Sequence, residues 1–234
     1  MARSIKIGIK TIGQIGKAGS ARLLNSFLQS GCAACDRATP QPLCVDCDRQ
    51  LKAQIQRPLR TAATPQSPQI AALGAYDGVL KRTILALKYE NKPDVALFLG
   101  TELGQRWTEA DRRPACVLPI PLHASRQRQR GYNQAALLAR SFCRASGLKL
   151  VENGLVRSQA TIPQHQLGLE ARQQNLAGVF EIGKSLNRLK AKRDSINVVL
   201  VDDIYTTGTT MQSAIGVLAD AGISTIGLAV AART

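Results

Sequence analysis

The chain has 234 residues, which suits one sizeable domain or one domain with a small appendage. It contains 31 Lys and Arg against 16 Asp and Glu. This net charge of +15 favours a polyanionic partner such as nucleic acid, although a solvated basic surface is the simpler interpretation. No run of 18 apolar residues occurs, so we expect no membrane span, and an aromatic content of 4% disfavours extended base-stacking surfaces.

The N-terminal stretch is basic, with ten Lys or Arg and three Asp or Glu in the first 60 residues. Lysines interrupt residues 1–20, which therefore lack the apolar core of a signal peptide. We expect a solvated tail. Apolar spacing predicts a short helix at Ala21–Gln29 and a second helix at Asp46–Gln56.

Four cysteines form the pattern C-x2-C-x8-C-x2-C, at Cys32, Cys35, Cys44 and Cys47. Each CxxC pair can provide two thiolates to one tetrahedral metal ion, and four thiolates suit Zn2+. Such a site leaves no coordination position open, so we predict a structural zinc knuckle. A secreted disulfide framework and a redox pair both fit less well, because no secretory signal precedes the cysteines and neither CxxC begins a helix of a βαβ pattern.

Three prolines among small polar residues mark Arg57–Gln69 as a linker or boundary. The sequence therefore predicts three parts. These are residues 1–60 with the basic tail and the zinc-binding segment, a linker at 61–69, and a larger domain at 70–234.

The larger domain alternates between strand and helix patterns. We predict strands at Ile70–Tyr76, Val117–Ile120, Lys149–Val151, Val179–Ile182, Asn197–Val201 and Thr225–Ala231. We predict helices at Asp77–Tyr89, from Pro93 to about Asp111, at Gln134–Ser146 and from about Thr210 to Ala221. This alternation indicates an α/β fold with a mostly parallel sheet that helices cover on both faces.

Basic residues stand out at two places in this domain. In the helix at Asp77–Tyr89, the apolar stripe leaves Lys81, Arg82 and Lys88 on the outside. After the strand at Val117–Ile120, we predict a basic loop that runs from Pro121 to Asn133 and contains Arg126, Arg128 and Arg130. This loop is either a solvated excursion or a surface for DNA phosphates.

The most informative stretch is Val198–Thr210. A buried strand is followed by two adjacent carboxylates, Asp202 and Asp203, and then by a hydroxyl-rich turn that opens a helix. Ligands of open α/β sheets bind beyond the carboxyl ends of the strands, and a helix N-terminus offers unpaired N–H groups to an anion. The turn can therefore hold a phosphate, and the two carboxylates can accept hydrogen bonds from sugar hydroxyls.

These thirteen residues resemble the phosphoribosyl-pyrophosphate (PRPP) motif of type I phosphoribosyltransferases, in which hydrophobic residues precede Asp-Asp and a Thr-rich, Gly-containing loop follows. Tyr205 departs mildly from that motif, where a smaller aliphatic residue is commoner. The resemblance implies that Asp202 and Asp203 bind the ribose and favour the positive charge that develops during transfer. It implies that the 5′-phosphate binds to Thr206, Thr207, Gly208, Thr209 and Thr210, and that Mg2+ bridges the pyrophosphate, mostly through water.

Pyrophosphate needs donors from another loop, for which His123 and Arg126 are the candidates. His123 fits a phosphate donor and a structural residue equally well. Leu155–Asn175, with Arg157 and Arg172, resembles the mobile catalytic loop of glutamine-PRPP amidotransferases. It is therefore either a lid with two catalytic arginines or an ordinary surface excursion. The glutaminase domain of those enzymes has no counterpart, so the acceptor stays unidentified.

Longer segments resemble the ComF family, also called ComFC or GntX-like: Tyr76–Tyr89, Leu118–Ala139, Leu155–Phe180, Val198–Arg233 and the four-cysteine knuckle. The resemblance implies a bacterial cytoplasmic protein with a phosphoribosyltransferase fold. It also implies a link to natural transformation, in which some members act beside a helicase-like ATPase during DNA uptake.

Three functions remain open. The first is a phosphoribosyltransferase that uses PRPP and Mg2+. The second is a non-catalytic, PRPP-responsive adaptor that binds single-stranded or double-stranded DNA. The third is a metabolic salvage enzyme without a DNA role.

Overall fold

The computed structural model describes residues 30–56, 59–61, 68–111, 113–158 and 179–234. The predicted helix at Ala21–Gln29 lies outside these residues, as does most of the predicted linker at 61–69. No helix in the described part of the chain is long and apolar enough to cross a membrane.

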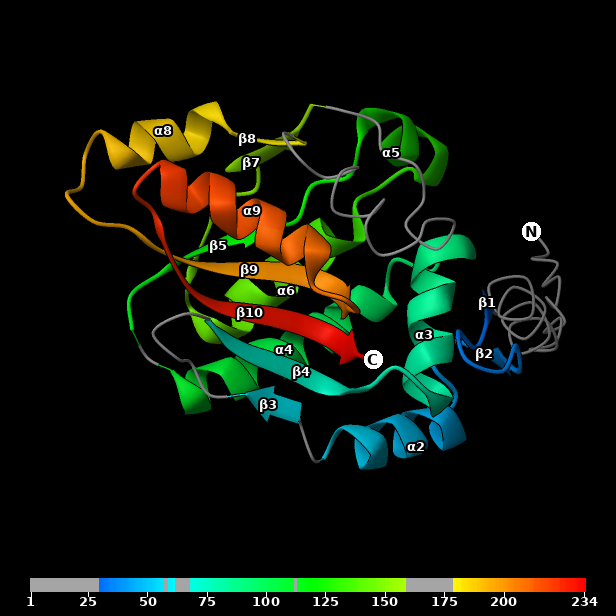
Figure 1. Cartoon of the computed structure of the whole chain (residues 1–234). Coiled ribbons are helices and arrows are strands. Elements are labelled where there is room, and N and C mark those ends of the chain that lie inside the picture. Colours follow the sequence, from blue (N-terminus) through cyan, green and yellow to red (C-terminus); the bar gives the residue numbers. More distant parts are fainter. Residues whose placement is uncertain (1–29, 57–58, 62–67, 112, 159–178) are drawn as a thin grey trace, which may run out of the picture.

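A six-stranded sheet forms the centre of the protein (Figure 1). Its strands, in spatial order, are β3 (Leu59–Thr61), β4 (Gln69–Ala75), β10 (Ser224–Arg233), β9 (Asn197–Tyr205), β5 (Cys116–Pro119) and β6 (Lys149–Leu150). All neighbours pair in parallel except β3 with β4. The predicted mostly parallel sheet is therefore confirmed, and β3 is an antiparallel edge strand that the sequence pattern did not reveal.

Helices cover both faces of this sheet, as predicted. One face packs against α3 (Gly78–Tyr89), α4 (Val95–Ala110) and α6 (Gln134–Ser146), and the other against α9 (Thr209–Asp220). Figure 1 shows α9 in front of the sheet and α4 and α6 behind it. The helix α4 begins at Val95 with Asp94 as its N-cap, so Pro93 lies just before the helix and not in its first turn.

The helices α4 and α6 pack closely because two glycines of α4 face α6. A Cβ at Gly100 would lie 2.5 Å from the carbonyl oxygen of Leu138, and one at Gly104 would lie 2.5 Å from that of Phe142. The side chain of Asn133 caps α6 by accepting the N–H of Ala135 at 3.0 Å. The backbone of α6 is therefore held firmly, with its N-terminal end at the C-terminal edge of β5.

Alternate residues of β9 enter different cores. Val199 and Val201 pack on the side of α3, α4 and α6, whereas Val198 and Leu200 pack on the side of α9. This parity follows from the two-residue period of a strand.

Two further pieces accompany the sheet. Near the N-terminus, β1 (Ser30–Gly31) and β2 (Ala38–Thr39) pair antiparallel and lead into α2 (Val45–Ile55), which packs against α3 and β4. A separate hairpin pairs β7 (Leu155–Arg157) with β8 (Phe180–Ile182), and α8 (Lys184–Lys190) follows it. The predicted strand at Val179–Ile182 is therefore real, but it does not join the central sheet.

The basic segment after β5 differs from its prediction as a loop, because it contains a helix, α5 (Ala124–Arg130). Long Arg and Gln side chains have good helix propensity. His123 forms the N-cap and Gly131, with φ of 82°, ends the helix in the left-handed region.

Candidate active site and metal centre

The strand order reverses between β5 and β9. The chain leaves β5 for β6 on one side of the sheet and leaves β9 for β10 on the other. Such a switch point opens a crevice at the carboxyl ends of the two strands. A cleft of about 1020 Å³ lies here, lined by residues that follow β5, residues that follow β9, the end of α3 and Arg157 of β7.

The two carboxylates of β9 point to opposite sides of the sheet. The strand continues to Tyr205, further than the predicted end at Val201, so Asp202 and Asp203 alternate like the residues before them. Asp203 is buried and lies on the α3 side, where its Oδ1 is 2.9 Å from Nζ of Lys88. Both carboxylates line the cleft.

Lys88 is a site residue that the sequence pattern misplaced. Its side chain is only 19% exposed, although we predicted it on the outer side of its helix. Burial acts to lower the pKa of Lys88, but the charge and hydrogen bond of Asp203 outweigh burial, and the net pKa is raised. Lys88 follows Ile84 by four residues, so it lies next to the apolar stripe, and this spacing is the signal that could have revealed it.

Asp202 occupies the side of β9 that faces α9 and the hairpin. Its Oδ1 accepts the backbone N–H of Asp203 at 2.8 Å. Burial and then the negative charge of Asp203 raise its pKa to about 7, against the opposing effects of that hydrogen bond, Lys88 and Arg157. The pair therefore carries less negative charge at neutral pH than two ordinary aspartates would.

We expect Asp202→Asn to stabilise the ligand-free protein at alkaline pH. Because the pKa of Asp202 is higher in the folded state, folding binds a proton between about pH 4 and pH 7, and stability falls as pH rises through this window. Asparagine cannot ionise, yet it keeps the Oδ1 that accepts the Asp203 N–H. The gain at pH 8 should be about 1–3 kcal/mol after allowance for solvent screening. Urea unfolding at pH 4 and pH 8 measures it, and a gain of equal size at both values would contradict the account.

The turn after β9 brings the N-terminus of α9 to the cleft. Gly208, with φ of 78°, is the N-cap of α9, and a Cβ there would overlap the Tyr205 hydroxyl. Thr206, Gly208, Thr209 and Thr210 line the cleft, whereas Thr207 does not; its hydroxyl lies 2.8 Å from that of Thr209. The first N–H groups of α9 thus face the same cleft as the carboxylates.

Several basic side chains also line the cleft. Arg126, Arg128 and Arg130 of α5 line it, together with Arg157. Burial and then the charge of Arg126 lower the pKa of Arg157, which indicates that these two guanidinium groups lie near each other. Arg172, the second predicted catalytic arginine, lies outside the described residues, as does most of the predicted lid.

His123 is not among the residues that line the cleft. Its Nδ1 accepts the backbone N–H of Ser125 at 3.3 Å and lies 2.7 Å from the Ser125 hydroxyl. These contacts cap α5, so the geometry favours the structural interpretation of His123 over the phosphate donor.

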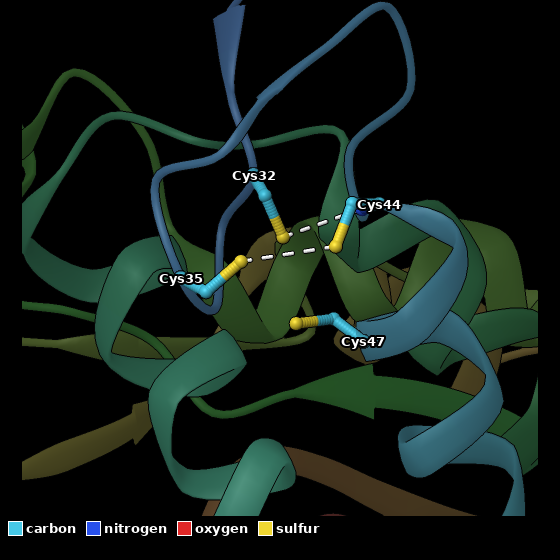
Figure 2. A group of neighbouring side chains, drawn as sticks. All are labelled: Cys32, Cys35, Cys44 and Cys47. Atoms are coloured by element: carbon cyan, nitrogen blue, oxygen red, sulfur yellow. Dashed lines mark hydrogen bonds between the residues drawn. The ribbon is translucent and has the colours of Figure 1, made fainter.

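The four cysteines come together near the N-terminus, and their sulfur atoms all lie within 4.8 Å of one another (Figure 2). Sγ of Cys35 lies 3.7 Å from Sγ of Cys44. Zinc–sulfur bonds of about 2.3 Å place tetrahedral sulfurs roughly 3.8 Å apart, so only small side-chain movements would bring the four sulfurs to zinc-binding distance.

Backbone N–H groups support the cluster. Those of Cys44 and Ala34 donate to Sγ of Cys32 at 3.3 and 3.5 Å. Burial raises the pKa of Cys32, but these hydrogen bonds and two from Cys35, by its backbone and its side chain, outweigh burial and lower it to about 7. Hydrogen bonds of this kind favour the thiolate, which is the form that binds a metal.

The cysteine segment is joined to the rest of the protein through α3 and the residues that follow it. Nε of Arg82 donates to the carbonyl of Ala34 at 2.9 Å, and Nζ of Lys92 donates to that of Gly31 at 2.8 Å. Leu51 of α2 shares one hydrophobic core with Leu80 of α3.

The parallel sheet, the switch-point cleft and the carboxylate pair beside a helix N-terminus define a phosphoribosyltransferase-fold protein. The phosphoribosyl transferase domain model matches residues 130–234. More closely, the chain is similar to competence proteins of the ComF type within this superfamily.

Three relatives illustrate the similarity. Competence protein F of Haemophilus influenzae is 29% identical over 215 residues, which cover 89% of this chain and 91% of the relative. The DNA utilization protein YhgH of Salmonella typhimurium is 28% identical, with 83% and 86% covered. Competence protein ComFC of Bacillus subtilis is 25% identical, with 63% and 56% covered.

Proposed function

We propose that this protein binds PRPP with Mg2+ in the cleft and transfers the phosphoribosyl group to an acceptor during DNA uptake in natural transformation. The observation that carries the proposal is the meeting of two carboxylates, a helix N-terminus and several arginines in one cleft at the switch point. These are the groups that a phosphorylated sugar with a pyrophosphate at C1 requires.

The ribose would bind between the carboxylates and the turn. Lys88 contacts Oδ1 of Asp203, so it orients this carboxylate while Oδ2 can accept from a ribose hydroxyl. Asp202, on the other face of β9, accepts from a second hydroxyl. The 5′-phosphate would lie against the first N–H groups of α9, where the helix dipole favours negative charge.

The leaving group would bind among the basic side chains of the cleft. Arg126 and Arg157 both line the cleft, so their guanidinium groups can neutralise the departing pyrophosphate. The carboxylates of β9 and the polar cleft suit Mg2+, which binds oxygen ligands and keeps much of its water. When bound, Mg2+ would neutralise charge on the pyrophosphate oxygens.

A role in DNA uptake is supported by two observations. The relatives are competence and DNA utilization proteins, and this chain has a net charge of +15. We further propose that a helicase-like ATPase of the uptake machinery is a partner and that the protein is cytoplasmic. We also propose that a zinc ion on the four cysteines stabilises the N-terminal segment.

A PRPP-responsive adaptor without catalysis is the second candidate, since one relative is named a competence protein and another a DNA utilization protein, and neither name states a transfer reaction. The two candidates differ in one product. Pyrophosphate release with some acceptor supports the enzyme, whereas PRPP binding without release over a broad panel of amines and bases supports the adaptor.

We expect PRPP with Mg2+ to raise the melting temperature by about 5–10 °C at a hundredfold excess over the dissociation constant. The double variant Asp202→Asn/Asp203→Asn should lose this shift, because it cannot accept from the ribose as a charged pair. Asp220→Asn, at the other end of α9 and exposed, is the matched control and should keep it. A shift that survives in the double variant would disprove the site assignment.

A further inference from the structure

Tyr89 is an exposed aromatic ring at the edge of the cleft. It is the last residue of α3 and is 70% exposed, whereas the other aromatic side chains in the described part of the chain are buried or half-buried. It lines the cleft beside Lys88, the residue that contacts Asp203. The apolar faces of this ring are in contact with water unless a ligand covers them, and removing apolar surface from water is favourable.

A guanidinium group holds one side of this ring. Cζ of Arg130 lies 5.4 Å from the ring centroid, within the range of a cation–π contact. Arg130 comes from α5 and Tyr89 from α3, so this contact joins the two helices at the cleft. The high exposure of Tyr89 leaves ring surface open to a flat ligand.

The surroundings of the ring are strongly basic. Arg126, Arg128 and Arg130 line the same cleft, so a ligand on Tyr89 would carry negative charge as well as a planar ring. A base linked to phosphate meets both requirements, because bases stack on tyrosine and arginine pairs with phosphate. The low aromatic content of the chain argues against an extended stacking surface, but one ring is enough for one base.

We propose that Tyr89 and Arg130 form a stacking subsite for the base of a nucleotide, whose phosphate Arg128 and Arg130 contact, while Arg126 is left for the pyrophosphate. This deepens the proposed function and rests on it for one point, namely that the base occupies the half of the cleft that PRPP leaves open. The base comes either from a free nucleotide or from a single strand, and both sources present the same chemistry.

The test compares two labelled oligonucleotides of equal length and charge, one of thymidines and one of abasic sites, by fluorescence anisotropy. Wild-type protein should bind the thymidine strand about 5- to 100-fold more tightly. Tyr89→Ala should lose this preference, and Tyr89→Phe should keep it. If thymidine monophosphate displaces the labelled thymidine strand, the free nucleotide is the source of the base. If only an unlabelled thymidine strand displaces it, the single strand is the source.

Equal affinity for the two strands, absence of binding to both, or an unchanged preference in Tyr89→Ala would overturn the subsite. The PRPP-induced rise in melting temperature is recorded on the same variants and should be retained, because Lys88, which contacts Asp203, and the start of α9 are both unchanged in them. If the wild type shows no base preference but keeps its PRPP response, the subsite is wrong and the proposed function is unaffected. If the wild type shows no PRPP response, the proposed function is wrong.

Discussion

Asp203→Asn should lower the free energy of unfolding by about 2–3 kcal/mol and abolish the response to PRPP. The substitution leaves Lys88 charged and largely buried without its carboxylate, and removing one partner of a buried ion pair is costly. We expect less than the full cost of a dry pair, because the Lys88 and Asp203 side chains are 19% and 11% exposed. Urea unfolding at pH 7 measures the change.

A double-mutant cycle isolates the ion pair. Lys88→Met/Asp203→Asn should be more stable than Asp203→Asn alone, since methionine removes the unpaired charge and keeps the apolar stem. Lys81→Met, an exposed lysine on the same helix, is the matched control and should change stability by less than about 0.5 kcal/mol. Strictly additive single effects would mean that Lys88 and Asp203 do not interact.

Removal of zinc should unfold the N-terminal segment. Structural zinc binding contributes about 10–16 kcal/mol in zinc-finger peptides, more than the total stability of many domains. Purified, reduced protein should contain one equivalent of zinc. Cys44→Ser should lose it, and the melting temperature should fall by more than about 10 °C, because Cys44 and Cys47 belong to the core that includes Leu51 and Leu80.

The matched control for the metal site is Cys143→Ala. Cys143 lies in α6, away from the four-cysteine cluster, so this variant should retain the full zinc content. Metal analysis combined with hydrogen exchange over residues 30–55 measures both effects. Well under one equivalent of zinc in the wild type would contradict the assignment of the knuckle.

The elements that the sequence predicted best are those whose signals are local. The helix at Gln134–Ser146 was predicted to its ends, because Gly147 with φ of 72° closes it and Asn133 caps it. The motif around Asp202 and the C-x2-C pairs depend on short spacing, which the sequence shows directly. These features can therefore be recognised from the sequence alone.

The features that were missed depend on tertiary contacts. The spacing of Lys88 from Ile84 places it next to the apolar stripe, but its partner Asp203 is 115 positions away, and no helical period shows such a partner. The strand β3 exists because β4 pairs with it, and β8 leaves the central sheet because β7 pairs with it. The basic segment after β5 has no apolar stripe, which is the main signal of a helix in a sequence, so helix α5 was not predicted.

The most direct test of the central claim is a crystal structure of the protein with PRPP and Mg2+. We expect the ribose hydroxyls within hydrogen-bond distance of Asp202 and Asp203, and the 5′-phosphate against the backbone N–H groups at the start of α9. PRPP bound elsewhere, or a cleft without ligand at saturating PRPP and Mg2+, would contradict the account.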